Sequence, residues 1–209
     1  MVGRRPGGTV PGMDDLLADV ATFGESPTIL VACGFDGALA YLGDERALQQ
    51  SSEALNALLA LPGTTVAVVS RRAAEEMAEL MFLSGAKGGL RTIAPEDVGP
   101  LHAELGGAAL VVDVDPGPMA GLGDGDLGVL VDGDTDADPD AEPEGCVYRV
   151  VDAEDVVLVL EELVEVRWRR LLVTGHTTQG RPAIDTTPVP AFTDRAGPPG
   201  PPRAPSAGR

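Results

Sequence analysis

The chain has 209 residues, an apolar share of 44% and a formal net charge of −18 at pH 7. This length and composition fit one folded domain with a sizeable core and exclude a wholly disordered chain. Acidic residues outnumber basic ones by 33 to 15, which argues against binding to nucleic acid or to an anionic membrane, because like charges repel.

The N-terminal third of the sequence predicts a flexible segment followed by a helix, a strand and a second helix. Residues 1–12 are rich in Gly and Pro and lack the apolar core of a signal peptide, so we expect a flexible segment. Apolar residues at helical spacing predict a helix over 13–23. A continuous apolar run predicts a buried strand over 28–35, and leucines before a Pro-Gly stop predict a helix over 51–61.

The middle of the chain continues this alternation. β-Branched residues predict a strand over 64–69, and a helix is expected over 72–82. After a glycine-rich break at 85–89, a short strand is expected over 90–93 and a helix with an early proline over 95–105.

Three further apolar runs predict strands over 108–114, 128–131 and 147–150, and the clearest helix covers 153–172. Strands that alternate with helices predict a three-layer α/β fold, with a mostly parallel sheet covered by helices on both faces, over residues 13–172. Residues 173–209 are rich in Pro and Gly and are expected to form a disordered tail, or alternatively a proline-rich ligand for an adaptor domain.

Cysteine content bears on the compartment. The two isolated cysteines, Cys33 and Cys146, form neither a disulfide framework nor a metal-ligand spacing, so a reducing cytoplasm is expected. No apolar run is as long as a membrane span, so we expect no membrane association.

Polar residues follow three of the predicted strands. The run Gly34-Phe35-Asp36-Gly37 spans the end of the first strand, Ser70-Arg71-Arg72 follows the second, and Asp113-Val114-Asp115 spans the end of the strand at 108–114. The carboxyl ends of parallel strands share one edge of a sheet, which is where open α/β sheets place their chemistry. These residues are therefore predicted to form one site.

The runs resemble the haloacid-dehalogenase-like superfamily and, within it, the trehalose-phosphatase family. The first family motif reads Asp-Phe-Asp-Gly-Thr-Leu, and the second reads Ala-Val-Val-Ser-Gly-Arg against Ala67-Val68-Val69-Ser70-Arg71-Arg72 here. The resemblance covers 13–83 and, more loosely, 108–163. It implies a Mg²⁺-dependent phosphatase in which one Asp attacks phosphorus and a second acts as general acid and base.

Position by position, the resemblance implies three kinds of site residue. Asp36 matches the general acid/base. The metal-binding acids match Asp113 and Asp115, and the phosphate-binding residues match Ser70, Arg72 and a basic residue for which Lys87 and Arg91 are both candidates.

The chain departs from the family pattern at decisive positions. Gly34 stands where the family has its nucleophilic Asp, and Ala38 stands where it has Thr. The interval between Ser70 and Asp113 is too short for the cap domain that the family inserts there. The resemblance therefore predicts the scaffold of a phosphatase, without a cap, from which a nucleophile and one metal carboxylate have been lost.

Purely structural roles are open for the same residues. Asp36-Gly37 is a common turn pair, Ser70 could cap the following helix, and Asp113 and Asp115 could be solvated acids at a strand end. The acidic run at 132–138 lacks the later Glu of an EF-hand and is expected to be a solvated loop.

Two features of the sequence lie outside the motif. His102 has no partner pattern and is expected to be an ordinary helix residue. Trp168 and its neighbours Arg167, Arg169 and Arg170 mark either a partner surface or a packed helix end.

Three functions are compatible with the sequence. The first is a catalytically degenerate trehalose-phosphatase-like domain that serves as a binding or regulatory module, with a protein or a small phosphorylated sugar as its partner. The second is an active Mg²⁺-dependent phosphatase on trehalose 6-phosphate or another small sugar phosphate. The third is a remnant with no selected activity. The sequence leaves the oligomeric state open.

Overall fold

The computed structural model describes residues 12–81, 90–132 and 147–178. Strands and helices alternate along most of these segments, and two short 3-10 helices, η1 and η2, occur in the connections. The elements in chain order are α1 (Met13–Gly24), β1 (Ile29–Gly34), α2 (Gln49–Leu59), β2 (Thr64–Val69), α3 (Ala74–Leu80), β3 (Leu90–Ile93), η1 (Pro95–Asp97), α4 (Val98–Leu105), β4 (Ala108–Asp113), η2 (Gly117–Met119), β5 (Leu127–Val131), β6 (Val147–Val150) and α5 (Ala153–Thr178).

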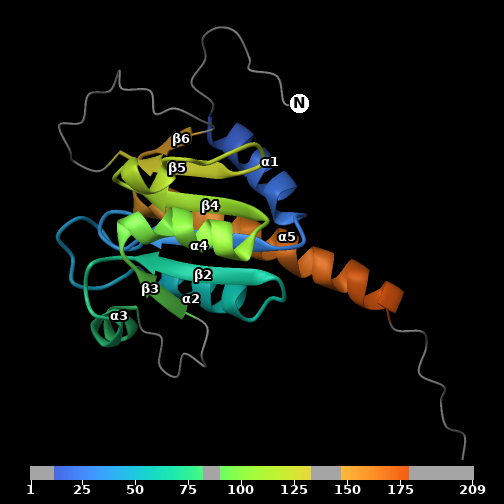
Figure 1. Ribbon diagram of the computed structural model, residues 1–209, viewed down its shortest axis with the longest axis horizontal. Coiled ribbons are helices and arrows are strands. Elements are labelled where there is room, and N and C mark those ends of the chain that lie inside the picture. The colour runs from blue at the N-terminus through green and yellow to red at the C-terminus, as the bar shows by residue number, and fades with distance from the viewer. Residues whose placement is uncertain (1–11, 82–89, 133–146, 179–209) are drawn as a thin grey trace, which may run out of the picture. The chain divides into compact units, whose positions relative to one another are not determined.

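The six described strands form one sheet in the order β3-β2-β1-β4-β5-β6, and every neighbouring pair is parallel (Figure 1). β1 lies at the centre, between β2 and β4. Its register sets Cys33 beside Val68 of β2 and beside Val112 of β4. The carboxyl ends of these three strands therefore meet at one edge.

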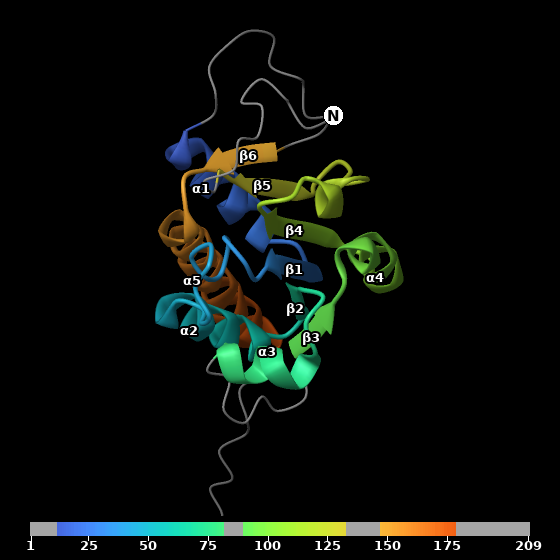
Figure 2. The same ribbon diagram turned by 90° about the vertical axis from the view of Figure 1, so that its left-hand side faces the viewer.

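Helices cover both faces of the sheet. α1, α2 and α5 lie against one face and α4 lies against the other (Figure 2). Alternate residues of β1 serve the two faces: Ile29, Val31 and Cys33 belong to the larger core, whereas Leu30 and Ala32 belong to the smaller one. This alternation is the two-residue period of a strand that is buried on both sides.

The described elements match the predicted three-layer α/β class, and all six predicted strands are present within one or two residues at each end. The predicted helix over 72–82 is shorter, because only Ala74–Leu80 is helical. The segment 95–105 divides into η1 and α4.

The last helix differs most from its prediction. α5 extends to Thr178, so residues 173–178 belong to a helix and not to the predicted tail. Four predicted segments lie outside the described residues: the N-terminal segment apart from Gly12, the break at 85–89, the acidic loop after Asp132 and the tail beyond Thr178. Within the described part of the chain, no helix is long and apolar enough to cross a membrane.

Candidate functional site at the carboxyl edge of the sheet

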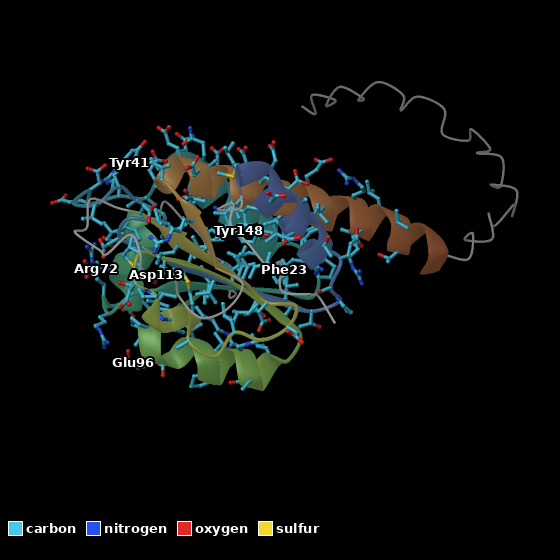
Figure 3. All side chains as sticks on the ribbon, turned by 90° about the horizontal axis from the view of Figure 1, so that it is seen from above. Phe23, Tyr41, Arg72, Glu96, Asp113 and Tyr148 are labelled. Carbon is cyan, nitrogen blue, oxygen red and sulfur yellow. The ribbon has the colours of Figure 1, made fainter. Side chains whose placement is uncertain are left out.

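Three of the predicted residues lie where β1, β2 and β4 end. Gly34 is the last residue of β1, Ser70 follows β2, and Asp113 is the last residue of β4. Arg72 and Asp113 lie toward the same end of the molecule, away from Phe23 near the opposite edge (Figure 3). The sheet topology therefore places these predicted residues along one edge, as their order in the sequence indicated.

The carboxylate of Asp113 occupies the space beside Gly34. A Cβ atom added at Gly34 would lie 2.7 Å from Asp113 Oδ2 and 3.0 Å from Oδ1. Cys33 pairs with Val112, so Gly34 and Asp113 are the next neighbours along the two strands. The position that the resemblance assigns to a nucleophile thus has no side chain, and its space is taken by an acid from the adjacent strand.

Burial controls the ionisation of Asp113. The residue is 7% exposed, and its pKa is raised to about 6 chiefly by burial. The backbone N–H groups of Asp115 and Val114 lower this pKa, and the charges of Asp115 and Asp36 raise it. The bond from the Asp115 N–H to Asp113 Oδ1 is 3.0 Å long and holds the carboxylate in place.

We expect the stability to depend on pH through Asp113. Near pH 5 the folded state keeps this carboxyl protonated while the unfolded chain, with a pKa near 3.8, releases the proton. The folded state then binds more protons, so the free energy of unfolding should fall as pH rises between about 4 and 6, by on the order of 2–3 kcal/mol from this group. Asp113→Asn should remove this component.

The measurement is urea unfolding of the wild type and Asp113→Asn at several pH values from 4 to 7. Their difference in unfolding free energy isolates Asp113 from the many other acids of the chain. A difference that stays constant over this range would show that Asp113 has an ordinary pKa.

Asp36 is engaged by a basic residue. Arg72 Nη2 lies 3.0 Å from Asp36 Oδ1, and the Arg72 guanidinium stacks 5.1 Å from the centre of the Phe35 ring. Gly37 has φ of +85°, a backbone conformation that favours glycine, so the predicted Asp-Gly turn is confirmed. The acid that matches the general acid/base is therefore held in an ion pair, and Arg72 is the partner.

Ser70 makes a local turn. Its Oγ accepts a 3.1 Å hydrogen bond from the Arg72 N–H, and its own N–H donates to the Ile93 carbonyl at 2.8 Å. The alternative prediction that Ser70 caps the next helix is wrong, because α3 begins after Ala73. The hydroxyl is thus close to Arg72 but is used within the backbone turn.

Of the remaining predicted residues, Arg91 faces α4, Lys87 is outside the described chain, and Asp115 lies beside Asp113 with its carboxylate in a turn. Arg91 is 3.9 Å from Glu104 of α4, which orients it toward that helix. Lys87 lies outside the described residues. Asp115 Oδ1 accepts a 2.9 Å hydrogen bond from the Gly117 N–H and so begins the turn into η2.

Cys33 does not supply a replacement nucleophile. Its side chain is fully buried, and its pKa is raised to about 12, first by burial and then by the charge of Asp113. A thiol in that state is not ionised near neutral pH and does not react as a thiolate.

Sequence reasoning missed two buried charged groups. Asp126 is 6% exposed and accepts hydrogen bonds from the Ala109 and Gly123 N–H groups, both at 2.8 Å, and His102 Nε2 lies 3.5 Å from it. Arg167 is 3% exposed. Its position continues the apolar spacing of Leu160 and Leu163 on α5, which was the available signal for its burial.

Comparisons with known proteins bear on the fold. No protein-family model and no curated protein matches the chain. Among the solved structures that match are two of Aspergillus fumigatus trehalose-6-phosphate phosphatase. Crystal form 2 has a TM-score of 0.55 at 12% identity over 75% of this chain and 100% of that one. Crystal form 3 has a TM-score of 0.50 at 12% identity, and the match covers 76% of this chain and 99% of that one.

These similarities establish the class of fold. The chain has an α/β, Rossmann-like fold similar to that of Aspergillus fumigatus trehalose-6-phosphate phosphatase. The particular structures it resembles share too few residues with it to transfer an activity, since one fold supports many functions.

A magnesium ion is the cofactor that the resemblance implies, and the described residues of this edge do not fit one. Mg²⁺ needs oxygen ligands in octahedral geometry. Position 34 offers no side-chain oxygen, Asp36 is paired with Arg72, and Asp115 bonds the turn at Gly117. Across the described residues, no group of three or more His, Cys, Asp or Glu side chains is placed to hold a metal. Among the described acids of this edge, Asp113 is the buried one.

Proposed function

We propose that the chain is a catalytically degenerate domain with a trehalose-phosphatase-like fold, and that it acts as a binding or regulatory module. One observation carries this proposal: β1 ends in Gly34, and the space beside it is filled by the Asp113 carboxylate. An aspartyl-phosphate mechanism requires a carboxylate on this strand that can reach phosphorus. Asp113 is buried and held by a backbone N–H, which suits it poorly to that task.

Three further features support the same proposal. The Asp36 carboxylate forms a 3.0 Å ion pair with Arg72, so it is already engaged by another side chain of this edge. Ala38 is fully buried in the core and offers no hydroxyl. Between β2 and β4 the described elements are α3, β3, η1 and α4, which supports a domain without a cap.

The expected ligand is a small phosphorylated sugar or a protein partner, and the expected compartment is the cytoplasm. The basic side chain of Arg72 and the hydroxyl of Ser70 lie at the edge where such a phosphate would bind. The free, buried thiol of Cys33 is compatible with a reducing environment.

An active Mg²⁺-dependent phosphatase on trehalose 6-phosphate, or on another small sugar phosphate, is the second candidate. The position of the Asp113 carboxylate favours it, because both of its oxygens lie within 3.0 Å of the Cβ position of residue 34. In this alternative Asp113 replaces the missing nucleophile from the neighbouring strand.

A phosphatase assay distinguishes the two candidates. With Mg²⁺ and either trehalose 6-phosphate or p-nitrophenyl phosphate, we expect phosphate release at the uncatalysed rate, because no carboxylate on β1 can form a covalent intermediate. Asp113→Asn and Asp36→Asn should give traces identical to the wild type. Turnover that either substitution abolishes would refute the proposal and establish the second candidate.

Metal binding gives an independent readout. A melting curve with and without Mg²⁺ should show no saturable shift, because a ligand that binds only the folded state would raise the melting temperature. Ca²⁺ at the same concentration controls for general screening of the acidic surface. A saturable rise in melting temperature with Mg²⁺ that is absent in Asp113→Asn would show that a metal site including Asp113 is present.

A further inference from the structure

The opposite edge of the sheet carries a cavity of about 280 Å³. It lies where β1 and β2 begin, beside Pro27 and Pro62, and α5 closes it on the other side. Arg167 and Arg170 line it, and none of the described residues that line it is acidic. A cavity lined by two arginines is unusual in a chain whose net charge is −18.

Arg167 is a buried cation held by neutral groups. Its Nη1 donates to the carbonyls of Gly24 at 3.2 Å and Ser26 at 2.5 Å, and its Nη2 donates to the carbonyl of Pro62 at 2.6 Å. Within the described chain no carboxylate lies within 4.0 Å of it, and its Nε–H has no acceptor. Buried charges in proteins are usually paired with an opposite charge.

Arg170 adds a second positive charge, and one nearby acid, Glu25, only partly balances the charge of the two arginines. It donates to the backbone carbonyl of Glu25, and its Nη1 lies 3.6 Å from Glu25 Oε2. One carboxylate is therefore set against two guanidinium groups. Burial first, and then the charge of Arg170, lower the pKa of Arg167, and the smaller effect of the Glu25 charge raises it.

We propose that this cavity is a binding site for a small oxyanion, a phosphate or a carboxylate group, in which Arg170 and the Nε–H of Arg167 provide the contacts. Planar guanidinium groups match the geometry of both anions. Pro27, Pro62 and Leu171 form apolar walls that limit hydration and strengthen the attraction. The site lies at the amino ends of the strands, so it is separate from the edge with Asp113 and does not depend on the proposed function.

The test is a melting curve of the full chain with inorganic phosphate, against chloride at equal ionic strength. We expect a saturable rise of about 2–4 °C at phosphate concentrations several times the dissociation constant. Arg170→Ala should remove the rise. Arg169→Ala, which changes the charge equally at an exposed neighbour, and Arg72→Ala at the other edge should retain it. Acetate in place of phosphate shows whether a carboxylate suffices.

A nitrogen NMR spectrum tests the same contact without a substitution. Phosphate should shift the Nε–H signal of Arg167 and leave that of Arg169 unchanged. The proposal is overturned if no saturable rise occurs, if Arg170→Ala retains the rise, or if Arg72→Ala alone abolishes it. The last result would assign phosphate to the carboxyl edge.

Discussion

Replacing Arg167 by Met is expected to lower the free energy of unfolding by about 2–4 kcal/mol. The guanidinium joins three backbone carbonyls from two connections that are far apart in sequence: Gly24 and Ser26 before β1, and Pro62 before β2. Methionine has a similar length and no donor, so it leaves these carbonyls without partners. Each lost bond from a charged donor costs about 1–3 kcal/mol, and removing a buried charge offsets part of the loss.

Urea unfolding followed by circular dichroism measures this loss. Arg169→Met is the matched control, because Arg169 is an exposed neighbour that forms an ion pair 3.2 Å long with Glu165. Such surface pairs contribute less than about 1 kcal/mol, so the control should stay close to the wild type. Equal losses in the two variants would mean that Arg167 does not connect the three carbonyls in solution.

Gly34→Asp is expected to destabilise the protein by about 2–3 kcal/mol and, by itself, to leave it inactive. The new Cβ would lie 2.7 Å from Asp113 Oδ2, so the Asp113 side chain must rotate away and lose its bond from the Asp115 N–H. Overpacking of this kind typically costs about 1–3 kcal/mol, and a second carboxylate beside a buried one adds repulsion.

A double-mutant cycle separates the steric part from the charge. Gly34→Ala should cost about 1–2 kcal/mol in the wild type and less than about 0.5 kcal/mol when Asp113 is also replaced by Ala, because the clash is then removed. Unfolding free energies in urea give the coupling. Additive effects of the two substitutions would contradict the close approach of Asp113 to Gly34.

The cycle also bears on the proposed function. If the Asp113 carboxylate fills the place of the lost nucleophile, then restoring Asp at position 34 and Thr at position 38 is insufficient unless Asp113 can move. Phosphate release by Gly34→Asp/Ala38→Thr, measured with Mg²⁺ and trehalose 6-phosphate, would show that the rest of the edge has kept a catalytic geometry.

The order of the elements could be predicted from the sequence because each strand of this sheet is a local pattern. β1 and β4 are continuous apolar runs bounded by turn residues, and both lie within two residues of their predicted positions. Since the strands are parallel, the residues that follow them had to meet at one edge, so Gly34, Ser70 and Asp113 could be grouped from their order along the chain.

Helix ends were predicted less well, because they depend on contacts and capping. No side chain caps α3, which begins at Ala74 instead of the predicted Arg72. α5 continues past Leu172 to Thr178, although Leu172 and Val173 are both exposed, so the amphipathic pattern that predicts a buried helix ends before the helix does.

The α/β class, the positions at which the strands end and the lack of a carboxylate at position 34 could be derived from the sequence alone. The three-dimensional fold was needed to show that Asp113 fills the space beside Gly34, that Arg72 forms an ion pair with Asp36, and that Arg167 is a buried cation beside a cavity. The reason is physical. Periodicity reports which way one element faces, whereas the direction of a charged side chain depends on the free space and partners that distant segments provide.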